Sequence, residues 1–203
     1  RRPSSGRGRS PCLAMLYQVL AFLIEIAVTL IGGACLLRLY MGWRRMSMGN
    51  PVGRFVQALS DWLVLPLQRM VPAAGRWDVA SLLGAWLLKL LQYAALVGML
   101  ELGRWSVLPL LALLGVAKLA VSVATAVIIV AAVLSWTGNR TPVRDVFERL
   151  CEPLLAPLRQ RVPLVGGVDL SPLLGVVLLQ VAGIVLGSLQ AGLLGAGAAM
   201  LAV

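Results

Sequence analysis

The feature that most constrains this chain is the length of its uncharged apolar stretches. Residues 170–203 contain no Asp, Glu, Lys or Arg, and neither do residues 119–139. A helix needs about 20 mostly apolar residues to cross a bilayer, and two further stretches reach that length with isolated charges. The sequence therefore predicts four transmembrane helices, at residues 16–40 and 79–102, from residue 107, and from residue 172.

Composition supports the same fold class and excludes much familiar chemistry. Hydrophobic residues make up 60% of the 203 residues and charged residues 13%, whereas soluble domains carry about 25% charge. The chain has no His, so His-based triads and His-ligated zinc or haem are excluded. Its three cysteines, Cys12, Cys35 and Cys151, form no CxxC pair. We therefore predict an all-α membrane protein that is not an enzyme and has no catalytic, cofactor-binding or metal site.

The chain also contains an internal repeat. Residues 51–83 align with residues 142–174 at a constant offset of 91 and without a gap. Three prolines, a glycine and an aspartate recur in register, which is much stronger evidence than matching leucines. The identical pairs are Pro51/Pro142, Val52/Val143, Leu59/Leu150, Leu63/Leu154, Pro66/Pro157, Leu67/Leu158, Val71/Val162, Pro72/Pro163, Gly75/Gly166, Asp78/Asp169, Leu82/Leu173 and Leu83/Leu174.

The same offset carries residues 16–40 onto 107–131 and residues 79–102 onto 170–193. Each unit is then a span, an amphipathic helix and a second span, and each crosses the membrane twice. Two such units have the same orientation, which gives parallel tandem repeats, unlike the inverted repeats of many transporters. We assign residues 15–103 to the first repeat and 104–203 to the second. Residues 1–14, rich in Arg, Ser, Gly and Pro, are expected to be a non-native or disordered leader.

Each long loop is predicted to form an amphipathic helix that lies along the membrane surface, an arm. Pro51 and Pro142 occupy first-turn positions, and Pro66 and Pro157 are expected to break the helices. The alternative is a cytoplasmic hairpin in which each arm packs against the other. The first arm presents Val52, Phe55, Val56, Leu59 and Leu63 on its apolar face, and the second presents Val143, Val146, Phe147, Leu150, Leu154 and Leu158, with Arg144–Glu148 and Asp145–Arg149 as opposite-charge pairs.

A turn then leads each arm back into the bilayer. Proline fixes φ and glycine frees it, and an aspartate can cap the following helix. The alternative role of this neck is that its Arg and Asp side chains contact lipid phosphates or a partner. The turn residues are Pro72, Gly75 and Asp78 in the first copy and Pro163, Gly166 and Asp169 in the second, and the basic interfacial residues are Arg69, Arg76, Arg159 and Arg161.

Charge distribution predicts the orientation of the chain. The formal net charge is +10, which in a membrane protein reports topology rather than nucleic-acid binding. Five arginines in each long loop outweigh Arg104 in the short connection, so the positive-inside rule places both loops in the cytoplasm and both termini outside. The arginines among residues 1–9 favour the opposite orientation.

The repeated segment resembles a known family. Asn50 and Pro51 are followed by an amphipathic helix, a PLxxxVP turn and Gly-x-x-Asp before a span, and this order resembles the YggT family, also called YlmG. The opening MLYQVLAFL from Met15 is similar to the family's N terminus, and the resemblance covers about residues 15–190 in both copies. The second copy departs in having Thr141 before its proline.

The resemblance implies a multi-pass protein of bacterial inner membranes, with relatives in plastids. Members are associated with osmotic-stress tolerance, with division or nucleoid organisation and, in plastids, with haem attachment. The family brings no catalytic residues. Because this chain has no His and no paired Cys, the resemblance implies a scaffold rather than a direct haem ligand.

Three charges near the middle of the predicted spans, Glu25, Lys89 and Lys118, need a partner. A charge at mid-span costs about 2.5–3.5 kcal/mol on insertion scales. The three residues lie at similar depths, so we predict a paired cluster that fixes helix register, with an ion path or substrate contact as the alternative. In the fourth span, Gly183 and Gly187 form a GxxxG pair that is expected to pack within the chain rather than form a dimer face.

These features favour a non-enzymatic inner-membrane protein of osmotic-stress or ion homeostasis and envelope organisation. It would act through its basic amphipathic cytoplasmic arms. One alternative is an ion channel or carrier that uses Glu25, Lys89 and Lys118, and another is an assembly or scaffold factor for a membrane complex. The expected partners are membrane lipids, with a membrane-protein partner or a second copy of the chain compatible with the sequence, and no nucleic acid.

Overall fold

The structure, a computed structural model, describes residues 11–71, 78–99, 105–136, 141–160 and 170–200. Within these ranges all regular structure is helical and no strand occurs. The helices are α1 (Pro11–Trp43), α2 (Pro51–Met70), α3 (Val79–Met99), α4 (Leu108–Trp136), α5 (Pro142–Arg159) and α6 (Ser171–Met200), with a 3₁₀ turn at Trp105–Val107 before α4.

Three helices are long and apolar enough to cross a membrane. They are Gln18–Trp43 of α1, Leu108–Trp136 of α4 and Ser171–Leu193 of α6. The apolar part of α3, Val79–Ala95, is shorter. α3, α4 and α6 begin within a few residues of the predicted stretches, whereas α1 begins at Pro11, inside the segment 1–14 that the sequence sets apart.

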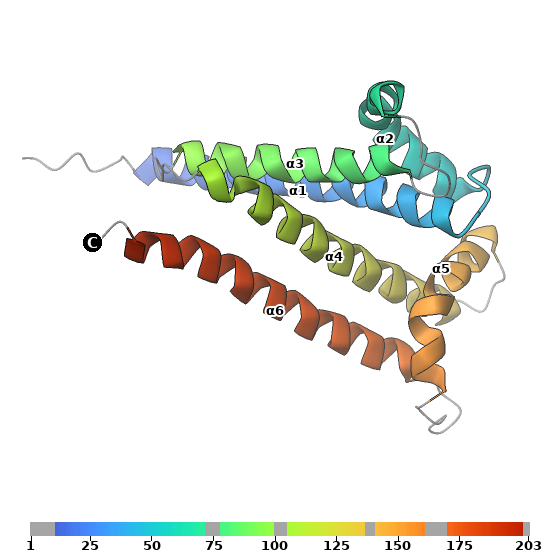
Figure 1. Cartoon of the computed structure of the whole chain (residues 1–203). Helices are drawn as coiled ribbons and strands as arrows, with labels where there is room; N and C mark the ends of the chain where they lie inside the picture. Colours follow the sequence, from blue (N-terminus) through green and yellow to red (C-terminus); the bar gives the residue numbers. More distant parts are fainter. Residues whose placement is uncertain (1–10, 72–77, 100–104, 137–140, 161–169, 201–203) are drawn as a thin grey trace, which may run out of the picture.

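The long helices pack side by side, in the order α1, α3, α4, α6, and α1 also touches α4 (Figure 1). In Figure 1, α1 and α4 run in the same direction and α3 and α6 run back. The arm α2 packs against α1 and α3, and the arm α5 packs against α4 and α6. Both arms lie at the end of the array where α1 and α4 finish. Each arm thus packs mainly on its own pair of long helices, and α2 and α5 also touch each other.

The GxxxG pair of α6 faces α4. A Cβ placed on Gly183 would lie 3.8 Å from Cγ1 of Val121, and one placed on Gly187 would lie 3.8 Å from Nζ of Lys118. Small residues at such positions let two helix backbones approach closely. The pair thus lies next to α4, as packing within the chain requires, and its predicted preference over a dimer face stays a prediction.

Both arms begin with a side-chain cap. Oδ1 of Asn50 accepts a hydrogen bond from the Gly53 N–H at 2.6 Å, and Oγ1 of Thr141 accepts one from the Arg144 N–H at 3.3 Å. Pro51 and Pro142 follow directly in the first turn, where a missing N–H costs nothing. The predicted starts are confirmed, and Thr141 supplies the same cap as the asparagine of the first copy.

The predicted breaks at Pro66 and Pro157 are wrong. Pro66 lies inside α2, which continues to Met70, and Pro153 and Pro157 lie inside α5, which continues to Arg159. An interior proline removes one backbone hydrogen bond and crowds the preceding turn, which bends a helix without necessarily ending it. Figure 1 shows α5 changing direction along its length. Packing against the long helices maintains the last turn.

The buried faces agree with the sequence for α5 and only in part for α2. In α5, Val146, Leu150, Cys151 and Leu155 are buried, and Arg144 pairs with Glu148 at 2.7 Å, as predicted. The buried residues of α2 are Gly53, Val56, Ser60 and Val64. Phe55, predicted to share the apolar face of α2 with Val56, is 63% exposed, whereas Val56 is buried against the long helices. Apolar residues occur on both sides of α2, so hydrophobicity alone did not fix its rotation.

A substitution at Gly53 tests how closely the start of α2 packs against the preceding loop. A Cβ there would lie 2.5 Å from the backbone oxygen of Met48, a contact that the loop must move to relieve. Gly53→Ala is expected to lower the free energy of unfolding by about 1–3 kcal/mol, measured by SDS titration of the detergent-purified protein. The matched control is Gly42→Ala in α1, because nothing lies within 4 Å of its Cβ position. Equal stability of the two variants would contradict this account of the α2 start.

Candidate functional site

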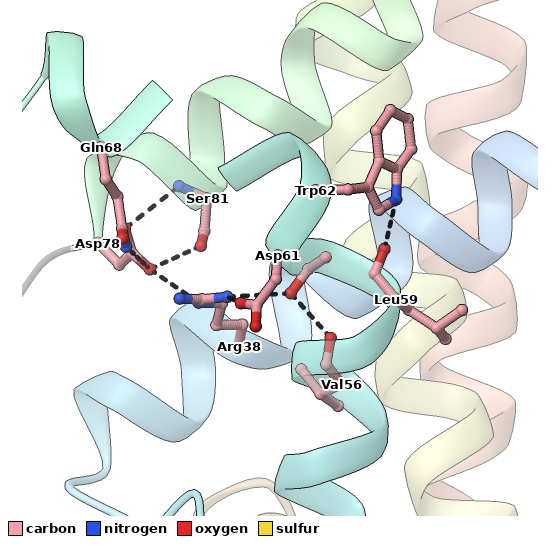
Figure 2. Close-up of polar contacts among 9 residues, drawn as sticks. Arg38, Val56, Leu59, Asp61, Trp62, Gln68, Asp78 and Ser81 are labelled. Carbon is pink, nitrogen blue, oxygen red and sulfur yellow. Dashed lines mark hydrogen bonds and ion pairs between the residues drawn. The ribbon is translucent and has the colours of Figure 1, made fainter. Parts of the chain in front are cut away.

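An arginine at the arm end of α1 is the centre of the most extensive polar network in the described residues. Arg38 has a side chain that is 12% exposed, and its guanidinium forms an ion pair with Asp61 of α2 (Figure 2). Its Nε lies 3.4 Å from Oδ2 of Asp78, the residue before α3. Its Nη1 also donates to Oγ of Ser60 at 3.3 Å. One cation is therefore shared between two carboxylates, and it joins α1, α2 and the start of α3.

Asp78 connects the network to Ser81 and Gln68. It accepts hydrogen bonds from the backbone N–H of Ser81 at 3.3 Å and from the Ser81 hydroxyl at 2.7 Å. Nε2 of Gln68, near the end of α2, donates to both of its carboxylate oxygens, at 3.2 and 3.3 Å. The predicted capping role of Asp78 is confirmed. The same side chain also connects the end of α2 to the beginning of α3 (Figure 2).

The residues of this network are suited to holding helices together. Arginine stays protonated at all relevant pH values and its five N–H groups match carboxylates well. A buried apolar cluster drawn from α1, α2, α3 and α4 lies next to this network. Its residues are Cys35, Leu36, Val64, Ala80, Ala85, Val116 and Leu119. A guanidinium held between carboxylates above an apolar cluster fixes the position of α2 relative to the long helices.

The second half replaces this network. At the offset of 91, Ile129 stands for Arg38 and Cys151 for Ser60, while Glu152 stands for Asp61. Cys151 is buried, and its Sγ lies 3.5 Å from the carbonyl oxygen of Val127, to which it donates. Burial raises the pKa of the Cys151 thiol to about 11, against a smaller opposing effect of Arg159. The thiol stays protonated near neutral pH, so it is a packing residue and not a nucleophile.

Helix α1 supplies part of the second half's packing. Met41 is fully buried among Val127, Ile128, Val146, Leu150, Cys151 and Leu155, which come from α4 and α5. The Tyr40 hydroxyl donates to the carbonyl oxygen of Leu150 at 2.9 Å. Arg44 lies 3.6 Å from Glu152. The end of α1 therefore bridges the two arms.

Within the part of the chain that the structure describes, Glu25, Lys89 and Lys118 form no ion pair with one another. Lys89 is buried, and its Nζ donates to Oε1 of Gln92 at 2.9 Å. Glu25 and Lys118 lie close enough to Lys89 to act on its charge, but both side chains are exposed on their helices. A functional cluster of the three stays a prediction.

A second polar contact crosses the same region. Nε2 of Gln190 in α6 donates to the Tyr93 hydroxyl of α3 at 2.9 Å. The Tyr93 ring reaches across α4 because Gly115 has no side chain there: a Cβ would lie 2.7 Å from Cε2 of the ring. This hydrogen bond connects two helices that are not adjacent in the row.

Several predicted site residues are exposed or lie outside the described residues. Arg69, in the last turn of α2, and Arg159, in the last turn of α5, are both exposed. Within the described ranges no group of His, Cys, Asp or Glu has the arrangement of a metal site. The residues that lie outside are Pro72, Gly75, Arg76, Arg161, Pro163, Gly166 and Asp169.

Sequence reasoning missed Arg38 and Asp61. A usable signal was present: Arg38 is a charge within the predicted first span, and Asp61 and Asp78 are the acidic residues of the loop that follows. A charge near the end of a span needs either a partner or access to solvent. The nearest carboxylates along the chain were therefore the natural candidates.

Replacing Arg38 with isoleucine, the residue at the equivalent position 129, tests the network. Asp61 and Asp78 would lose their shared cation, and we expect the free energy of unfolding to fall by about 2–4 kcal/mol. Trypsin cleavage at Arg54 and Arg69 of the loosened α2 should rise in parallel.

The control for this change is Arg44→Gln, which removes the more exposed pair with Glu152. Its cost should be at most about 1 kcal/mol, with no gain in trypsin cleavage. Equal losses for the two variants would show that Arg38 has no special role in holding α2.

Comparison with known proteins gives a consistent family match. The model of the CCB3/YggT family matches residues 17–100 and again residues 110–190. The "Uncharacterized protein YggT" of Escherichia coli (strain K12) is 33% identical over 169 residues, which cover 80% of this chain and 86% of that protein. The "Uncharacterized protein in proC 3'region" of Vibrio alginolyticus is 32% identical over 174 residues, covering 84% and 94%. No solved structure matches.

Proposed function

The chain belongs to the CCB3/YggT family, as the sequence resemblance indicated, and from that premise we propose that it is a non-enzymatic, four-span protein of the bacterial inner membrane. It acts in osmotic-stress or ion homeostasis and envelope organisation, through arm helices at the cytoplasmic surface. The observation that carries the proposal is the difference between the outer faces of the two arms.

The outer face of α2 is apolar and aromatic. Phe55 is 63% exposed, Trp62 61% and Met70 83%, and Leu65 lies between them. These side chains recur at helical spacing and so form one stripe, with exposed Arg54 and Arg69 near its two ends. The Trp62 indole N–H is already bonded to the carbonyl oxygen of Leu59 at 2.9 Å (Figure 2). The stripe can enter a headgroup layer or a partner's surface without leaving that donor unpaired.

The outer face of α5 is charged instead. Asp145, Glu148, Arg149 and Glu152 are exposed, and its large apolar side chains are buried or half-buried. A charged helix face favours water, whereas an apolar stripe with basic ends favours the bilayer interface. The proposal therefore assigns membrane or partner contact to α2 and a solvent-facing role to α5.

The fourth span of the proposal is α3. With 21 residues at about 1.5 Å each it is about as long as the roughly 30 Å hydrocarbon core. Its one charge, Lys89, is buried and hydrogen-bonded to Gln92. The opposed directions of α1 and α3, and of α4 and α6, support two units of parallel orientation that cover residues 15–103 and 104–203. The ten arginines of the two loops support a cytoplasmic position for both arms.

The α2 stripe gives a direct test of this function. In a bacterium that lacks its own family member, the wild-type chain should restore recovery after a hyperosmotic shift, and the double variant Phe55→Ser/Trp62→Ser should not. Both side chains are exposed, so the variant should match the wild type in abundance and in thermal stability. The matched control is Asp145→Asn, an exposed change on α5. Full recovery with the double variant would overturn the role of the α2 face.

The second candidate, a channel or carrier, is favoured by Lys89, a buried cation within a long helix. Purified protein in liposomes should show no potassium, sodium or proton flux above empty liposomes under an osmotic gradient, because the proposal requires no conduction. A flux that disappears in Glu25→Gln would replace the proposal with the channel. An assembly factor differs from both, since its loss would lower the amount of another membrane complex without any osmotic defect.

A further inference from the structure

A groove lies between α1 and α4 at the arm end of the long helices. Its volume is about 360 Å³, at the lower end of the range for ligand pockets. Its walls are apolar side chains of α1 and α4, with Leu154 of α5 at one end. Ala120 and Ala124, one turn apart on α4, are small residues that leave this space.

The groove is open to the surface of the helix array, and α1 and α4 are both long and apolar enough to cross a membrane. Ala120 is exposed, and Trp43 at the other wall is 43% exposed. An empty apolar groove would lose dispersion contacts along its whole lining, and water would find too few polar partners in it. The material that surrounds a spanning helix is hydrocarbon. The natural occupant is therefore an acyl chain of a membrane lipid.

A helix from a second copy fits the groove less well. A helix with its side chains is about 10–12 Å across, so in a space of this size it could insert only single side chains. An unbranched hydrocarbon chain can instead lie along the apolar lining that α1 and α4 provide. We therefore assign the groove to a lipid chain rather than to a helix of a second copy.

The charges at the end of the groove indicate the headgroup. Arg44 follows the lining residue Tyr40 by one helical turn, so the two lie on the same face of the chain as α1 ends. Arg45 comes next, with φ of 51°, and its N–H returns to the carbonyl oxygen of Gly42 at 3.0 Å. Arg45 thus follows the lining residue Trp43 by two positions, and its side chain is exposed and forms no ion pair with any residue that the structure describes.

Glu152 is the opposing charge at this mouth. Its carboxylate lies 3.6 Å from Arg44, and both side chains are partly exposed. One contact of that length leaves other guanidinium N–H groups available. Two arginines and one carboxylate leave a net positive charge, which fits a phosphate bearing a negative charge. Trp43 is the kind of residue that lines the headgroup level.

We infer that this groove binds one acyl chain of an anionic phospholipid whose phosphate is held by Arg44 and Arg45. The site is distinct from the α2 stripe and does not depend on the proposed function. The lipid would fill the space between α1 and α4 and join the end of α1 to the second arm.

The test uses the full chain, purified in detergent and analysed by native mass spectrometry with added phosphatidylglycerol or phosphatidylcholine of the same acyl composition. The wild type should retain phosphatidylglycerol in preference to phosphatidylcholine. Arg44→Gln/Arg45→Gln should weaken phosphatidylglycerol retention by about fivefold for each arginine and remove the preference. The control Arg149→Gln, an exposed change on α5, should leave the preference intact.

Variants that fill the groove provide the second part of the experiment. Ala124→Phe should reduce retention of both lipids, and Ala126→Phe, an exposed position of α4 outside the groove, should not. If Ala124→Phe does not fold, Ala120→Leu is the smaller filling variant. Retention that is unchanged in the filled variants, or equal for the two lipids in the wild type, would overturn the proposal. So would dissociation of a dimer on filling, because the groove would then hold a protein helix.

Discussion

The sharing of one guanidinium between two carboxylates controls how this chain is arranged. An apolar helix that enters water at its end can carry an arginine there only if that charge finds partners or solvent. Arg38 finds Asp61 on the arm and Asp78 at the start of the returning helix, so one side chain fixes three helices at once. The position of α2, and with it the direction in which Phe55 and Trp62 point, follows from this junction.

The local features of the fold were predictable because they depend on neighbours in sequence. The caps at Asn50 and Thr141, the aspartate cap at Asp78 and the extents of the long helices all follow from short-range rules. The features that failed depend on tertiary contacts. Whether a helix continues past Pro66 depends on what the following turn packs against. Whether Phe55 is inside depends on the rotation of α2, which Arg38 and Asp61 set from a separation of 23 residues.

The two halves share one arrangement of helices but hold their arms in place by different interactions. In the first, α2 is held by charge-assisted hydrogen bonds above a small apolar cluster. In the second, isoleucine and cysteine replace Arg38 and Ser60, and a larger apolar cluster together with Tyr40 holds α5. The exposed faces of the arms show the opposite pattern. The exposed face of α2, whose attachment is ionic, is apolar, and that of α5, whose attachment is mainly apolar, is charged. A pair of similar units thus presents two chemically different surfaces at one end of the molecule.

The burial of Met41 within the second half has a consequence for biogenesis. Its surroundings, Val146, Leu150 and Leu155 among them, belong to a helix synthesised about 100 residues later. During synthesis this surface of α1 therefore stays uncovered until α4 and α5 have been made. The first half can form before its packing is complete, and the last contacts of the earliest helix form only with the second half.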